Sequence, residues 1–177
     1  MKELKILNQT GLSLVEVLIA ALLTCLIGGF SLEFYMTQHN NWLVQEDISE
    51  MQQNVRVALD EISTNIRKAG YGLPVSHPSI SVATDSIKIF YKDSVKIDTL
   101  VYYVSRQDSL HPALMRRLNN TTPQVFAENI ESLQFQKVDK LVTVQITARE
   151  QRKDPHFVGD KYRRRVLTSR AEVRNRA

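Results

Sequence analysis

The carboxylate of Glu16 lies within an apolar run near the start of the chain. This run, from Leu12 to Leu32, carries no other charged residue. An ionised side chain at the centre of a bilayer costs about 2.5 to 3.5 kcal/mol on insertion scales, so an acid in such a segment is a candidate functional residue. The sequence therefore predicts that Glu16 has a cationic partner.

A second group of residues with possible chemistry is the basic cluster Arg163, Arg164 and Arg165. The chain has a formal net charge of +4 and a pI near 9.2, and its basic residues concentrate towards the C-terminus. Such a cluster could hold nucleic-acid phosphates. However, the arginines alternate along an expected strand, and no aromatic stacking platform accompanies them. We therefore predict a solvated or subunit-facing strand and keep nucleic acid as the less favoured partner.

Signs of an enzyme are weak in this sequence. The four histidines, His39, His77, His111 and His156, are isolated and have no partner at metal-ligand spacing. No phosphate-binding loop, nucleophile elbow or pair of acids stands out. Cys25 is the only cysteine, so no intramolecular disulfide can form. We expect no catalytic residue, no metal and no cofactor.

The apolar run that carries Glu16 has the length of a membrane span, which needs about 20 residues. Lys2 and Lys5 precede it, whereas the first basic residue after it is Arg56. The positive-inside rule then places the N-terminus in the cytoplasm and the remainder outside. We expect a single-pass protein of the inner membrane whose C-terminal part is periplasmic or exported.

Two ordinary signal peptides are poor explanations of this N-terminus. A secretory signal needs a shorter apolar stretch followed by a small-residue cleavage site, which is absent. A lipoprotein signal would have to use Cys25, but Thr24 precedes it and the residues that follow are apolar. Cys25 is better explained as a small apolar side chain.

A short basic leader ending in Gly11, then Leu12, then Glu16 as the fifth residue after the glycine, resembles a type IV prepilin. The resemblance implies that residues 1–11 are a leader and that a prepilin peptidase cleaves between Gly11 and Leu12. It also implies N-methylation of Leu12, although this family more often has Phe at that position.

The resemblance also supplies a partner for Glu16. Cleavage would create an α-amino group, which has a reference pKa of about 7.7 to 8 and stays largely cationic at neutral pH. In a filament this amine would pair with the Glu16 carboxylate of a neighbouring subunit and offset the desolvation of both. An alternative is a capping box, because Ser13 and Glu16 fit the Ser-x-x-Glu pattern. The two roles can coexist, but capping alone explains neither the leader nor the apolar run.

The helical pattern continues beyond the span. Apolar residues recur mainly at steps of three or four, with polar residues between them, which predicts an amphipathic helix. These residues are Trp42, Ile48, Met51, Val55, Leu59, Ile62 and Ile66. No proline interrupts residues 12–69, and Gly70 to Pro74 supplies a glycine cap and a stop. We expect one helix with a transmembrane half, 12–33, and an amphipathic half, 34–69.

After Pro74 the pattern changes to the alternation of β-strands. The expected strands cover 86–92, a more fully buried run at 100–104, then 130–138, 141–148 and 162–174. Turn-prone clusters separate them, as an antiparallel meander requires. The predicted fold is α+β, with the long helix packed on an antiparallel β-sheet head formed by residues 75–177.

The head resembles PilW-type minor pilins, which are similar to the J-type minor pseudopilins of type II secretion. The matching segments are 66–72, 129–135, 144–149 and 165–175. Many major pilins carry Pro where this chain has Glu33, which argues against a major subunit. The resemblance implies a pilin-like fold and a non-enzymatic subunit that initiates or caps a type IV pilus. Its partners would be prepilin peptidase, other minor and major pilins, and membrane lipid before assembly.

Two alternatives stay open at this point. The first is a minor pseudopilin of a type II secretion system. The second is a membrane-anchored protein that never polymerises and binds DNA or a surface.

Overall fold

The computed structural model describes residues 13–93, 95–108, 110–154 and 157–175. The chain divides into two compact units, Met1–Leu43 (unit 1) and Val44–Ala177 (unit 2). A single helix, α1 (Leu14–Lys68), contributes to both units. The other elements within these described ranges are eight strands, all of them in unit 2. One long N-terminal helix and antiparallel sheets confirm the predicted α+β class.

The described part of unit 1 consists of Ser13 and the first 30 residues of α1. Its apolar side chains are exposed except that of Leu43, which is half-buried. Leu14 is 77% exposed and Phe30 is 69% exposed. A helix that is apolar all round belongs in a membrane or in the interior of an assembly. This helix is long and apolar enough to cross a membrane, which is consistent with the single-pass anchor expected from the sequence.

The helical segment of unit 2 places one stripe of side chains in the core. The buried positions of α1 are Met51, Val55, Ala58, Leu59, Ile62, Ser63 and Ile66, and Ile48 is partly buried against them. Their spacing of mostly three and four residues confirms the predicted amphipathic stripe. Trp42 is an exception, because it lies in unit 1 and is 57% exposed.

The C-terminus of α1 has the glycine cap expected from the sequence. Gly70 has a φ of +80°, a left-handed conformation that glycine adopts without a steric penalty. The Gly70 N–H donates to the carbonyl of Phe90 at 2.8 Å, which ties the end of the helix to the sheet. A Cβ at this position would lie 2.3 Å from the backbone oxygen of Asn175.

We predict that Gly70→Ala destabilises unit 2 by about 1 to 3 kcal/mol, since strain at a left-handed position adds to the clash with Asn175. The matched control is Gly159→Ala, because Gly159 also has a positive φ but a Cβ added there would meet no atom within 4 Å. The measurement is hydrogen exchange of the β7 amides in each variant. Equal effects of the two changes would show that the close approach of Asn175 is unimportant.

The strands form two antiparallel sheets in which all neighbours are consecutive in the chain, five strands in one and three in the other. The five-stranded sheet contains β1 (Ile80–Val82), β2 (Ser86–Lys92), β3 (Ile97–Ser105), β4 (Ala113–Leu118) and β5 (Gln124–Glu128). The three-stranded sheet contains β6 (Ile130–Val138), β7 (Leu141–Arg149) and β8 (Arg164–Glu172). The predicted single meander is therefore wrong, because it is split between β5 and β6.

Three strands, β1, β4 and β5, were not predicted. In β4, Arg116 occupies a position where the alternation would require an apolar residue. Its charge is compensated by Glu61 of α1, which lies 3.0 Å away. β1 and β5 have three and five residues, too few for a clear period. The predicted run 100–104 lies in β3. Leu100 to Tyr102 are buried, whereas Tyr103 and Val104 are half-buried.

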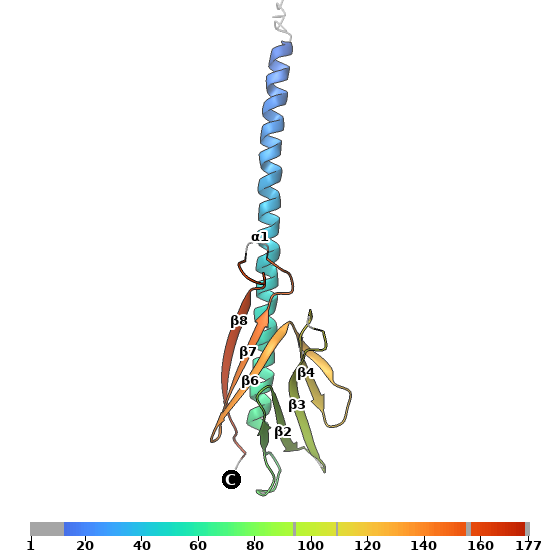
Figure 1. Cartoon of the computed structure of the whole chain (residues 1–177), viewed down its shortest axis with the longest axis vertical. Helices are drawn as coiled ribbons and strands as arrows, with labels where there is room; N and C mark the ends of the chain where they lie inside the picture. Colours follow the sequence, from blue (N-terminus) through green and yellow to red (C-terminus); the bar gives the residue numbers. More distant parts are fainter. Residues whose placement is uncertain (1–12, 94, 109, 155–156, 176–177) are drawn as a thin grey trace, which may run out of the picture. The chain divides into compact units, whose positions relative to one another are not determined.

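The core of unit 2 lies between the helical segment and both sheets. In Figure 1, β8 is drawn on one side of this segment and β3 and β4 on the other, and β6 crosses between them. Tyr102 of β3 is fully buried, and its hydroxyl donates to Glu61 Oε1 at 2.7 Å. On the other sheet, the hydroxyls of Ser63 and Ser169 lie 2.9 Å apart. Polar contacts therefore fix the helical segment against each sheet inside an otherwise apolar core.

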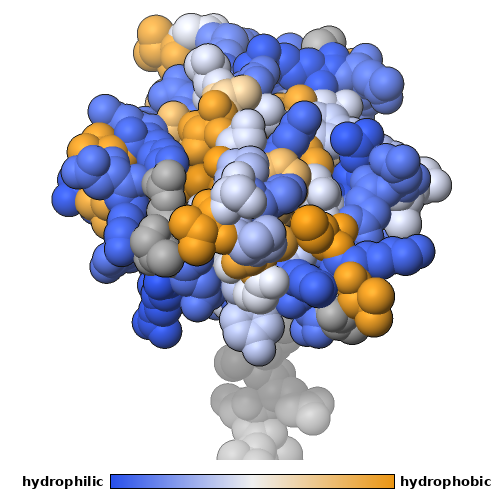
Figure 2. Space-filling view, turned by 90° about the horizontal axis from the view of Figure 1, so that it is seen from below, coloured by the Kyte–Doolittle hydropathy of each residue, from blue (hydrophilic) through white to orange (hydrophobic). Residues whose placement is uncertain are grey.

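Figure 2 shows the distribution of apolar and polar side chains on one end of unit 2. On this face, among the residues that are coloured, apolar side chains form small groups separated by polar ones. Scattered groups of this kind are normal on a protein surface. This end of unit 2 thus contrasts with the continuously exposed apolar residues of unit 1.

Candidate assembly site and basic cluster

Glu16 lies in the first turn of α1 and is exposed. Its Oε2 accepts a hydrogen bond from the backbone N–H of Ser13 at 3.1 Å. The Ser13 carbonyl accepts from the N–H of Val17 at 3.2 Å, so Ser13 is the N-cap residue. The bond from Ser13 to Glu16 is one half of a capping box. The carboxylate thus caps its own helix while remaining accessible to a second partner.

The predicted cleavage and methylation positions, Gly11 and Leu12, lie outside the described residues. Capping by Glu16 is compatible with cleavage there, since the Ser13 N–H belongs to a peptide bond that cleavage would leave intact. The new amino group would belong to Leu12, only four residues before Glu16. Processing and capping can therefore occur in the same molecule.

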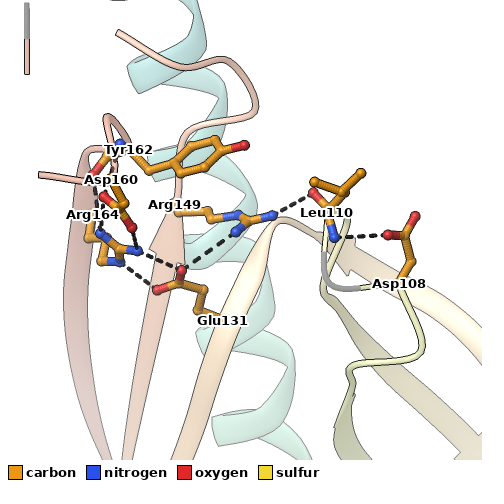
Figure 3. A network of polar contacts seen from close by, with 7 residues as sticks. All are labelled: Asp108, Leu110, Glu131, Arg149, Asp160, Tyr162 and Arg164. Atoms are coloured by element: carbon orange, nitrogen blue, oxygen red, sulfur yellow. Dashed lines mark hydrogen bonds and ion pairs between the residues drawn. The ribbon is translucent and has the colours of Figure 1, made fainter. Parts of the chain in front are cut away.

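The basic cluster lies at the start of β8, and much of its charge is neutralised within unit 2. Arg163 Nε donates to Asp154 Oδ2 at 2.9 Å. Arg164 donates to Glu131 at 2.6 and 2.9 Å and also to Asp160 (Figure 3). Arg165 is exposed and makes no ion pair with the described residues.

The ion pairs of Arg164 shift the pKa of both Asp160 and Arg164. The hydrogen bond from Arg164 lowers the pKa of Asp160 to about 2, and the hydrogen bonds to Asp160 and Glu131 raise the pKa of Arg164. A guanidinium held by two carboxylates has little charge left to release counterions from a nucleic acid. The geometry thus favours a structural role for Arg163 and Arg164 over phosphate binding.

Arg149 is the member of this region that sequence analysis missed. Only 8% of the residue is exposed, and its guanidinium donates to the Leu110 carbonyl at 2.5 Å (Figure 3). The same group lies 3.7 Å from Glu131 and 4.5 Å from the centre of the Tyr162 ring. Arg149 thereby links the end of β7 to the loop before β4 and to the loop before β8. The sequence signal that could have indicated a buried Arg149 is its position directly after the regular alternation of β7.

Two acids next to this network are buried. Asp154 is 4% exposed and is paired with Arg163, whereas Glu150 is 2% exposed. Glu150 Oε1 has no hydrogen-bond partner among the described residues and lies 3.9 Å from Arg163 Nε. Burial raises the pKa of Glu150 above the usual range of a glutamate. The cost of burying the Asp154 carboxylate is therefore offset by its ion pair with Arg163, whereas that of Glu150 is offset much less.

We predict that neutralising these two acids has different effects on the stability of unit 2. Asp154→Asn should destabilise unit 2 by about 1 to 3 kcal/mol, because Arg163 loses a charge-assisted hydrogen bond. Glu150→Gln should leave stability at pH 7 unchanged or higher, because a raised folded-state pKa means that the ionised form costs stability at high pH.

The sign of the Glu150 effect also predicts a pH dependence. Protonation restores the lost stability as the pH falls through the raised folded-state pKa, and the restoration is complete near the ordinary pKa of about 4.3. The benefit of Glu150→Gln should therefore shrink between pH 7 and that value. Thermal unfolding of both variants as a function of pH measures this, and a strong loss of stability in Glu150→Gln at pH 7 would contradict it.

The described residues contain no group of three or more His, Cys, Asp or Glu side chains that could hold a metal ion. Comparisons of the chain with protein-family models, with curated proteins and with solved structures gave no significant match. The functional conclusion therefore depends on the motif, the anchor helix and the geometry given above.

Proposed function

We propose that this chain is a minor pilin, processed by prepilin peptidase and used to initiate or cap a type IV pilus. One observation carries the proposal. Glu16, the fifth residue after Gly11, lies in the first turn of a 55-residue helix whose described residues in unit 1 bury none of their apolar side chains. An acid at the start of such a helix fits a segment that first crosses a membrane and then packs among the helices of a filament.

The proposed mechanism has two stages. Before assembly, the apolar residues of unit 1 are solvated by lipid, with the N-terminus in the cytoplasm and unit 2 outside. Cleavage after Gly11 then creates a cationic α-amino group on Leu12. During assembly this amine pairs with Glu16 of an adjoining subunit, because two charges in a low-dielectric medium are less costly together than apart. The pair would set the axial register of the subunits, and the pilin-like fold would place unit 2 on the filament surface.

The absence of a catalytic role is part of the proposal. The clustered charged groups of unit 2 are engaged in ion pairs that hold strands and loops together, as with Arg164, Glu131 and Asp160. A subunit of this kind acts through the surfaces that it presents to other pilins.

A minor pseudopilin of a type II secretion system is the second candidate within the same class. The same helix and acid would serve it equally well, and the two candidates differ in the machine that the subunit enters. Loss of the gene should remove surface pili in the first case and export of secreted proteins in the second.

The experiment that tests the proposal is recovery of the full chain from sheared surface filaments of its own host. We expect a low but reproducible amount in the filament fraction, together with the major pilin. Retention of the whole population in the membrane, with both piliation and secretion intact in a deletion strain, would contradict the proposal. That result would favour an anchored protein that does not polymerise.

A further inference from the structure

The loop between β7 and β8, described at residues 150–154 and 157–163, lies beside the first turns of the helical segment in unit 2 (Figure 1). Its two arms are joined by a hydrogen bond from the Asp154 N–H to the Lys161 carbonyl at 2.8 Å. Arg152 Nε lies 3.7 Å from Asp47 of α1. Asp47 is the fourth residue of unit 2, so the loop lies at the end of this unit from which the chain leads back to the apolar run.

The tip of this loop exposes apolar side chains. Phe157 is 40% exposed and Val158 is 92% exposed. The Phe157 N–H donates to the Asp154 carbonyl at 3.1 Å, and Gly159 has a φ of +101°. Two adjacent apolar side chains that are exposed to solvent are candidates for contact with an apolar phase such as a membrane.

The exposed charge around the tip is positive. Lys153 and Lys161 are exposed and make no ion pair with the described residues, whereas the exposed Arg152 is paired with Asp47. The acids of the loop do not balance them at its surface, because Glu150 and Asp154 are buried and Asp160 is paired with Arg164. Apolar side chains flanked by lysine and arginine are typical of segments that lie in the interface of an anionic membrane.

The sequence of α1 indicates which surface is available. Tyr35 and Trp42 of α1 are 66% and 57% exposed, and aromatic residues of this kind are enriched at membrane interfaces. Trp42 precedes Asp47 by only five residues. The exposed acids Glu46 and Glu50 also belong to this part of α1, so attraction to an anionic surface is confined to the loop.

We propose that the described residues of this loop, 150–154 and 157–163, form a second membrane contact, in which Phe157 and Val158 enter the headgroup region of the bilayer and Lys153 and Lys161 bind anionic phospholipid. The contact goes beyond the function proposed above and depends only on anchoring by α1. Because the anchor already keeps unit 2 near the bilayer, a weak interaction at the loop is sufficient. It would hold unit 2 at the membrane until the subunit leaves for an assembly.

The test uses the full chain with Cys25→Ser, so that a single new cysteine can carry an environment-sensitive fluorophore. The reporter is placed at Val158→Cys, and the matched control at Val75→Cys. Val75 is another exposed valine, 82% accessible, in the loop after the C-terminus of α1. Each protein is reconstituted into vesicles of phosphatidylcholine alone or of phosphatidylcholine mixed with phosphatidylglycerol.

We expect headgroup-level nitroxide lipids to quench the Val158 reporter several-fold more strongly than the Val75 reporter in the anionic vesicles. Lys153→Glu with Lys161→Glu, or about 0.5 M salt, should remove most of this difference, since the attraction is screened. Equal quenching at the two positions, or none at Val158, would overturn the proposal. A response to duplex DNA in neutral vesicles without a response to anionic lipid would also overturn it and indicate a nucleic-acid site. None of these results depends on cleavage at Gly11 or on Glu16.

Discussion

Glu16→Ala is expected to leave the chain in the membrane and to exclude it from filaments. Removing one partner of a charge pair in a low-dielectric medium costs about 3 to 5 kcal/mol, which corresponds to a loss of incorporation of at least two orders of magnitude. Insertion should be unaffected, because the apolar run loses a charge and keeps its length. The measurement is the ratio of the variant in sheared filaments to the variant in the membrane fraction.

Two further variants separate pairing from capping. Glu16→Gln retains an oxygen that can accept the hydrogen bond from the Ser13 N–H but has no charge. If Glu16 acts through the ion pair, the Gln variant should fail like the Ala variant. Glu33→Ala is the matched control, because Glu33 is an exposed acid of the same helical unit. Normal incorporation of Glu16→Gln would contradict the register role and leave only the helix cap.

Ile62→Ala is expected to destabilise unit 2 by about 2 to 5 kcal/mol, because a large apolar side chain is replaced by a small one in a closed core. Ile62 is fully buried, and its stripe on α1 packs against both sheets. Hydrogen exchange of the β6 and β7 amides reports the change. In the control, Val57→Ala, the side chain comes from the same helix but is 54% exposed, so its effect should stay below about 1 kcal/mol. Similar effects of the two changes would show that the buried stripe does not hold the head together.

The parts of the fold with a strong period were predictable from the sequence. The amphipathic segment of α1 has apolar residues on one stripe, and β7 buries Val142, Val144 and Ile146 as its alternation predicted. A one-residue shift of such a strand would turn every apolar side chain to the opposite face, so the pattern fixes the burial. The end of α1 was equally predictable, since Gly70 and Pro74 are separate stop signals.

The division into two sheets was not predictable by the same means. Periodicity describes one strand at a time and carries no information on where a meander breaks. β4 was missed because Arg116 points towards Glu61, a contact between residues 55 positions apart. β1 was missed because three residues are too short to establish an alternation.

The candidate sites divide in a similar way. Glu16 stands out in the sequence, because a lone acid in an apolar run has no local compensation. The roles of Arg163 and Arg164 cannot be read from the sequence. Their carboxylate partners come close only when the fold brings together β6, β8 and the loop before β8. The basic character of Arg163 and Arg164 is therefore a poor guide to nucleic-acid binding, because folding commits their charge to internal pairs.

The most direct test of the account is mass spectrometry of the N-terminus of the native protein, isolated from its own host. The account predicts a chain that begins at Leu12 and carries one methyl group on its α-nitrogen, with residues 1–11 removed. A native chain that retains Met1 to Gly11 would contradict it, because the amine that Glu16 is proposed to pair with would then not exist.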